Sequence, residues 1–206
     1  MQFRSDFERI SAYHSWSRGK YLDLYDRLPW KVITRNREAS FGSIRNVHLH
    51  ILAVYAGWLV WMFHRRSLAP VLKRLDPKNF QQVTSVAKLR EFDRTIDRHM
   101  IAVSRTVSSA KLGRKLWFTS EGKRSAFTGE EGLWHMIEED YLHRGEIICM
   151  LWQDDIEPPN TSYMRWHYEI DPKRYAYLPY RPPARPQRVN ARTGRKIPRT
   201  RPSAAP

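Results

Sequence analysis

The chain has little cysteine, no apolar leader and no long hydrophobic run. Its single cysteine, Cys149, excludes an internal disulfide and a thiolate cluster that would hold structural zinc. The first eight residues contain no apolar stretch typical of a signal peptide. Residues 51–63 form the longest apolar region, and they are too few to cross a bilayer as a helix. We therefore expect a soluble, cytoplasmic protein that is not embedded in a membrane.

Acidic residues are also scarce: the chain has 21 Asp and Glu against 36 Lys and Arg, a net charge of +15. Residues 171–206 hold ten of the basic side chains and one acidic residue, Asp171, which gives this stretch a net charge of +9. Residues 1–170 carry the other 26 basic and 20 acidic side chains, a net charge of +6. An excess of this kind favours a polyanionic partner and says little about the fold.

Eight of the 13 prolines also lie in residues 171–206. With so little to bury, this stretch is predicted to be an extended basic tail, separate from a domain at residues 1–170. Cations interleaved with tyrosines suit phosphates and stacked bases, so the tail predicts contact with RNA, the ribosome or DNA. The alternative is a solvated tail that aids solubility. The candidate nucleic-acid-binding residues are Lys173, Arg174, Arg181, Arg185, Arg188, Arg192, Arg195, Lys196, Arg199 and Arg201.

Apolar residues make up 41% of the chain, enough to bury a core. Their three- and four-residue spacing predicts long helices at about residues 5–28, 43–65, 85–108 and 130–155. Residues 116–128 are expected to form a short hairpin or an extended loop before the last helix. We therefore predict an all-α, up-down four-helix bundle with short links between its helices.

Polar residues mark the starts of two predicted helices. Ser5 and Glu8 form a capping-box pattern, in which each side chain accepts a hydrogen bond from the other residue's backbone N–H. Glu130 and Glu131 open the last predicted helix, where acidic side chains favour the positive end of the helix dipole.

Two of the predicted helices carry side chains that ligate metals. Glu139 and His143 lie four residues apart, so they project from one face of the last helix. His50 lies on the apolar stripe of the second helix, which is expected to point inward. Two imidazoles and one carboxylate leave coordination positions open for water or substrate, which is the pattern of catalytic metal sites.

The sequence alone also allows other interpretations of these residues. Glu139 and His143 are also compatible with an exposed ion pair, and His50 with a histidine satisfied in the core. His48 and His135 lie near the same faces and are competing candidates for ligation.

Residues 41–52, FGSIRNVHLHIL, resemble the second-helix motif of the DinB/YfiT-like family. In that motif a Ser-Ile-Arg segment precedes a ligand histidine by seven residues, and Ser43 plus seven is His50. Residues 138–147, EEDYLHRGEI, resemble the family's fourth-helix signature of a ligand, three residues, then His-Arg-Gly-Gln/Glu. Residues 13–28 are similar to its first helix, so the resemblance covers about residues 7–160.

The resemblance implies a four-helix bundle that holds a divalent metal ion at His50, Glu139 and His143. Many members use three histidines; a His-Glu-His set is similar to the mycothiol-dependent maleylpyruvate isomerase branch. Zinc suits two imidazoles and one carboxylate, and nickel, iron or manganese are alternatives.

The implied function is a metal-dependent transferase or isomerase that uses a small thiol, since a bound metal lowers the pKa of a thiol or water. No motif names the reaction or the substrate, and the oligomeric state is not predicted. The alternatives are a nucleic-acid- or ribosome-associated protein that uses its tail, and a metal that only stabilises the bundle.

Several other residues have structural interpretations. Arg144 is expected to be a surface or helix-end cation rather than a guide for an anionic substrate. Cys149 is expected to be a small buried residue rather than a nucleophile. The tryptophans are expected in the core and in pocket linings, including Trp58, Trp61, Trp134 and Trp152.

Overall fold

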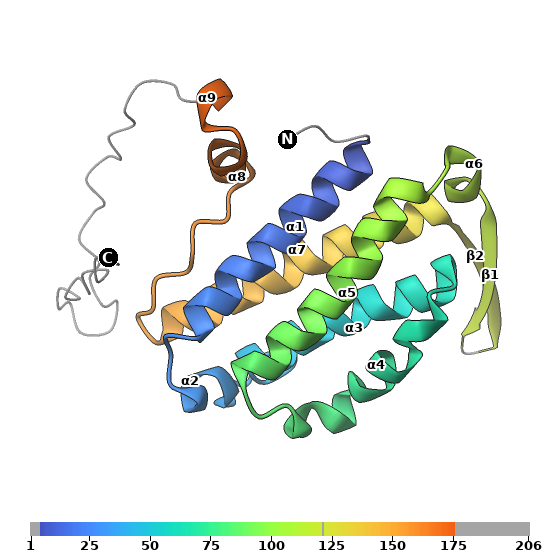
Figure 1. Cartoon of the computed structure of the whole chain (residues 1–206). Coiled ribbons are helices and arrows are strands. Elements are labelled where there is room, and N and C mark those ends of the chain that lie inside the picture. The colour runs from blue at the N-terminus through green and yellow to red at the C-terminus, as the bar shows by residue number, and fades with distance from the viewer. Residues whose placement is uncertain (1–4, 121, 176–206) are drawn as a thin grey trace. The chain divides into compact units, whose positions relative to one another are not determined.

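The computed structural model of the chain describes residues 5–120 and 122–175, and these residues are mostly helical (Figure 1). The long helices of this part are α1 (Asp6–Tyr25), α3 (Ile44–Phe63), α5 (Val86–Thr106) and α7 (Gly129–Gln153). Each begins within one residue of its predicted start. The all-helical class predicted from apolar spacing is therefore present.

Each long helix begins after a serine or threonine whose hydroxyl accepts a backbone N–H three residues ahead; these N-caps are Ser5, Ser43, Ser85 and Thr128. At Ser5 the hydroxyl accepts the Glu8 backbone N–H, which is one half of the predicted capping box, and the Glu8 carboxylate accepts a hydrogen bond from Arg105 Nε at 2.8 Å. A complete capping box forms instead at Thr128 and Glu131, where we predicted only a favourable acidic residue.

Helix α3 is central to the core, because it packs against both α7 and α5, while α1 packs against α5 (Figure 1). Its residues Val47, Leu49, Leu52 and Leu59 have no exposed surface. Within the described residues, α3 is also the helix that is long and apolar enough to cross a membrane, and 56% of its most apolar window is buried inside the fold. The core helix of a soluble protein passes the same test.

The links between the long helices contain short helices that apolar spacing did not predict. Helix α2 (Trp30–Thr34) follows Pro29 and buries Ile33. The link between α3 and α5 holds η1 (Arg66–Leu68), α4 (Ala69–Arg74) and η2 (Pro77–Gln82). This link adds Leu68, Leu75 and Phe80 to the core, so it is longer and more ordered than predicted.

A hairpin precedes α7, as expected for residues 116–128. Helix α6 (Ser109–Leu112) leads into β1 (Lys115–Ser120), which pairs antiparallel with β2 (Lys123–Thr128). Gly122 in the turn has φ +74, a conformation that L side chains rarely adopt. Strand β2 contacts α7, which places one end of the hairpin beside that helix.

The chain divides into two compact parts, residues 1–166 and residues 167–206. Helix α8 (Tyr163–Ile170) crosses this boundary, and α9 (Pro172–Tyr175) follows it. Two of the candidate nucleic-acid-binding residues, Lys173 and Arg174, are exposed on α9. The other eight lie outside the described residues, so the extended tail and its partner stay predictions.

Candidate metal centre

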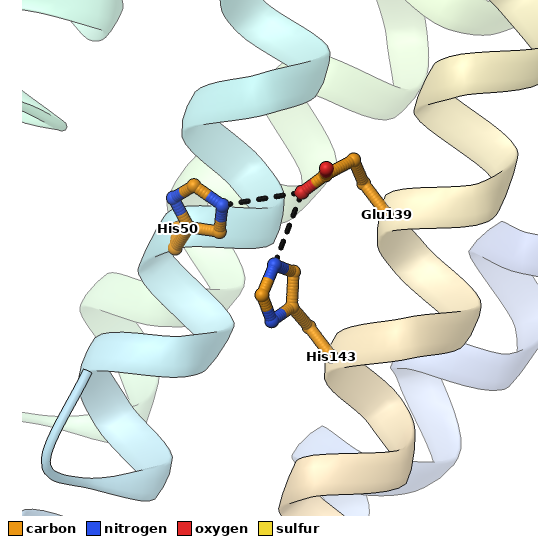
Figure 2. Close-up of side chains that lie close together, drawn as sticks. All are labelled: His50, Glu139 and His143. Atoms are coloured by element: carbon orange, nitrogen blue, oxygen red, sulfur yellow. Dashed lines mark hydrogen bonds and ion pairs between the residues drawn. The ribbon is translucent and has the colours of Figure 1, made fainter. Parts of the chain in front are cut away.

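The side chains of His50, Glu139 and His143 meet between α3 and α7 (Figure 2). Glu139 Oε2 lies 3.3 Å from His50 Nε2 and 3.0 Å from His143 Nε2. One ligand atom from each residue lies within 4.8 Å of the other two, so the group could hold a metal ion. We call these three residues the metal cluster.

Helix packing positions the metal cluster. Glu139 and His143 lie one turn apart on α7, and α7 packs along α3, which carries His50. The two imidazole rings are 4.6 Å apart and nearly perpendicular. Spacing on two separate helices left this convergence open beside other interpretations, and the motif resemblance described above implied it.

Glu146 orients His143 from the other side of its ring. Glu146 Oε2 lies 3.1 Å from His143 Nδ1 and also accepts a hydrogen bond from Ser40 Oγ at 2.8 Å. Glu146 and Glu139 are both acceptors, and a neutral imidazole carries one N–H, so in the Nδ1–H tautomer His143 donates to Glu146 and turns an unprotonated Nε2 toward Glu139. This is the tautomer that ligates a metal through Nε2.

This arrangement fits a cation. A lone pair on His143 Nε2 and a carboxylate oxygen 3.0 Å away repel one another unless a proton or a metal ion lies between them. Zinc bonds of about 2.0–2.1 Å in tetrahedral geometry separate neighbouring ligand atoms by about 3.3–3.4 Å. The two nitrogen–oxygen distances in the metal cluster are close to this value.

Phe41 covers the imidazole rings on one side. Its ring stacks on His50 with centroids 4.1 Å apart and meets the edge of His143 at 5.4 Å. The Phe41 carbonyl accepts a hydrogen bond from Asn46 Nδ2, which ties this loop to the start of α3. Burial lowers the pKa of His50, although Glu139 opposes the shift. The neutral imidazole that results is the form that binds metals.

The competing histidines lie elsewhere. His48 is buried against the Tyr25 ring, and burial lowers its pKa to about 3, so it is a neutral core residue. His135 is partly exposed, and its Nε2 lies 3.8 Å from Glu139 Oε1, beside the metal cluster but outside it.

Arg144 is not the surface or helix-end cation that we predicted. It is buried, and its Nε lies 2.7 Å from Asp140 Oδ1. It also donates to the Ser17 hydroxyl on α1. The prediction was wrong because α7 is covered on two sides, so a residue next to a metal-facing histidine points toward α1 instead of solvent.

Arg144 belongs to a buried ion network that links α1, α5 and α7. Asp140 is completely buried; it accepts a hydrogen bond from Arg18 Nη1 at 3.0 Å and lies 3.2 Å from His14 Nδ1. Burial alone would raise the pKa of Asp140, but His14 and the two guanidinium groups lower it far below its usual range. The buried ion network consists of Arg18, Asp93, Asp97, Asp140 and Arg144.

Two further expectations about α7 were wrong. Cys149 is exposed rather than buried, and Trp134 is 62% exposed rather than part of the core. Both lie on the solvent side of α7, as does Leu142. Trp152 is partly buried, while Trp58 and Trp61 line a cavity, as expected.

Sequence reasoning missed Glu146, Ser40 and Phe41. Glu146 lies inside the EEDYLHRGEI motif, three residues after His143, and this spacing was the available signal. Phe41 reaches the metal cluster, and Ser40 reaches Glu146, only because the loop before α3 folds back, which no residue spacing indicates.

Comparison with known proteins agrees with this geometry. The model of the DinB family matches residues 2–174, which includes all three residues of the metal cluster. None of the curated proteins compared with the chain matches it significantly.

Proposed function

The chain belongs to the DinB family, and from this membership and the geometry above we propose that it binds one divalent metal ion through His50, Glu139 and His143. The observation that carries the proposal is the position of Glu139 Oε2, which lies within 3.3 Å of an imidazole nitrogen from each of two residues. We interpret the four long helices that hold these residues as an up-down bundle of DinB type.

Zinc is the metal that we propose. Two imidazole nitrogens and one carboxylate oxygen are borderline donors that zinc accepts at tetrahedral distances, and nickel, iron or manganese are alternatives. Glu146 supports any of them, since a carboxylate that holds Nδ1–H keeps His143 in the ligating tautomer.

We further propose that the protein is a metal-dependent transferase or isomerase acting with a small thiol. Three protein ligands leave room for an exogenous ligand, and a bound metal would lower the pKa of a thiol or water there. Phe41 restricts water on one side of the rings of His50 and His143. The mycothiol-dependent maleylpyruvate isomerase branch stays a prediction from the His-Glu-His set.

Elemental analysis of the purified full-length chain tests the metal. The chain is treated with nuclease first, because a basic protein carries nucleic acid and its bound cations. We expect about one metal ion per chain in the wild type and a loss of at least tenfold in His143→Ala. His135→Ala is the matched control on the same helix and is expected to keep its metal. Equal metal content in the wild type and His143→Ala would contradict the proposal.

The charge asymmetry supports a second candidate function. Ten cations against one acidic residue in residues 171–206 suit contact with RNA, the ribosome or DNA. Fluorescence anisotropy with single-stranded RNA at several salt concentrations tests this. Removal of residues 171–206 is expected to weaken binding and flatten its salt dependence, while metal content stays unchanged. An unchanged salt slope would exclude the tail as the binding element.

A further inference from the structure

A cavity of about 590 Å³ lies where α3, α7 and the hairpin meet. Its lining combines aromatic rings with one imidazole and one carboxylate: Trp58, Trp61, Phe127, Glu131 and His135. We call it the aromatic cavity. Its size and its mostly apolar walls with a few polar groups are typical of sites for small molecules.

Trp58 is the central ring of this cavity. Its centroid lies 5.1 Å from that of Trp61, 5.3 Å from His135 and 6.2 Å from Phe127, and each pair is T-shaped. Edge-to-face packing of this kind fixes the rings against one another.

The position of Trp58 depends on a glycine in α7. A Cβ on Gly132 would lie 2.9 Å from Trp58 Cζ3 and 1.8 Å from Met62 Cε, so only glycine allows this close approach. Glu131, the preceding residue, is held by the complete capping box with Thr128. The wall of the cavity is therefore set by backbone constraints and not by loosely packed side chains.

The metal cluster lies on the same two helices as the aromatic cavity, and His135 connects them. His135 lines the cavity, and its Nε2 lies 3.8 Å from Glu139 Oε1. His135 precedes Glu139 by one turn, and Trp58 follows His50 by about two turns, which corresponds to about 6 and 12 Å along the helix axes. A small molecule can span this distance.

We propose that the aromatic cavity binds the flat, apolar body of a small substrate whose polar end reaches the metal cluster. The part that concerns the metal rests on the proposed function. Three aromatic rings stabilise an aromatic or similarly planar apolar group, and His135 is placed to contact the polar atoms that connect this group to the metal.

Three probes separate the two halves of the proposal. With the zinc-loaded full-length chain, 2-naphthohydroxamate offers both a metal-binding group and a planar body, acetohydroxamate offers only the metal-binding group, and naphthalene-2-carboxamide offers mainly the body. Isothermal titration calorimetry measures each. We expect 2-naphthohydroxamate to bind at least tenfold more tightly than acetohydroxamate. Equal affinities would overturn the proposal.

Alanine variants of the cavity rings test where the apolar body of the ligand binds. Phe127→Ala and Trp58→Ala are expected to weaken 2-naphthohydroxamate binding about tenfold and to leave acetohydroxamate binding unchanged. Phe127 is partly exposed on the hairpin, so its variant tests the proposal even if Trp58→Ala does not fold. The matched control is Trp117→Ala, an exposed ring on the paired strand that does not line the cavity. Equal losses in Trp117→Ala and Phe127→Ala would mean nonspecific binding to the hairpin and would also overturn the proposal.

Failure of the proposed function gives a different result. If the wild type holds no zinc, yet naphthalene-2-carboxamide binds and Phe127→Ala weakens it, the cavity half stands and the metal half falls. If zinc binds but Phe127→Ala changes neither naphthyl probe, the cavity half falls while the proposed function stands.

Discussion

Glu139 and Asp140 are neighbours in the sequence, yet they lie in two different polar environments. Glu139 is partly exposed and faces two imidazoles that carry no fixed charge, whereas Asp140 is fully buried and faces the guanidinium groups of Arg18 and Arg144. The buried ion network thus holds two guanidinium groups directly against its three carboxylates. Among the described residues no Lys or Arg pairs with the Glu139 carboxylate of the metal cluster, and this incompleteness is what a metal ion would satisfy.

The largest expected effect is the difference in stability between alanine variants of these two carboxylates. Asp140→Ala removes the carboxylate that faces the buried Arg144 guanidinium and one of the three that face Arg18, so we expect the free energy of unfolding to fall by about 3–5 kcal/mol. Glu139→Ala in metal-free protein should change it by less than about 1 kcal/mol, because that carboxylate is partly solvated. Urea denaturation measures both. Similar losses in the two variants would show that the two clusters do not differ as described.

Much of this contrast between the metal cluster and the buried ion network could not be predicted from the sequence. The spacing of apolar residues, with the cap pattern at Ser5 and the acidic residues Glu130 and Glu131, located the long helices within one residue at their starts, because these signals are local. The pair Glu139 and His143 was also predictable from its spacing on one helix. Arg144 was not, because spacing does not tell which sides of α7 other helices cover. Trp134 and Cys149 were misplaced for the same reason: α7 buries parts of several faces, so it has no single apolar stripe.

The contributions of loop and strand residues to the metal cluster and the aromatic cavity were harder still to predict from the sequence. Phe41 reaches the metal cluster, and Ser40 reaches Glu146, through a turn at Gly42, whose φ is +77. Phe127 enters the aromatic cavity from β2. Such contacts join segments distant in sequence, and only tertiary packing brings them together.

The next effect concerns the support of the metal cluster. Glu146→Gln can no longer hold His143 Nδ1–H as a charged acceptor, so we expect metal affinity to fall about 10–100-fold. Competition with a chromophoric chelator measures the affinity. Glu138→Gln, an exposed carboxylate on the same helix, is the control and should leave it unchanged. Equal affinities for wild type and Glu146→Gln would mean that Glu146 does not orient a ligand.

The smallest expected effect is the pH dependence of stability that arises from His48, a buried residue two positions before His50. Burial lowers the pKa of His48 to about 3, from an ordinary value of 6.5. The unfolded chain therefore binds a proton near pH 6.5 that the folded chain does not bind. Hence His48 favours the folded state above pH 6.5, and this contribution is lost as the pH falls toward 3.

His48→Leu removes this titration without breaking a hydrogen bond at Nε2, which has no partner among the described residues. For the metal-free wild type, His48 should account for a loss of about 0.7 kcal/mol in the free energy of unfolding between pH 7 and pH 6. Over the same pH range, the free energy of unfolding of His48→Leu should fall by about 0.7 kcal/mol less than that of the wild type. The other groups that titrate here, His50 included, are common to both proteins. Urea titrations at the two pH values measure the difference. Identical pH dependence would mean that His48 takes up its proton in the folded protein as readily as in the unfolded chain. The contrast between a dry core and a half-open metal cluster would then not hold at this turn of α3.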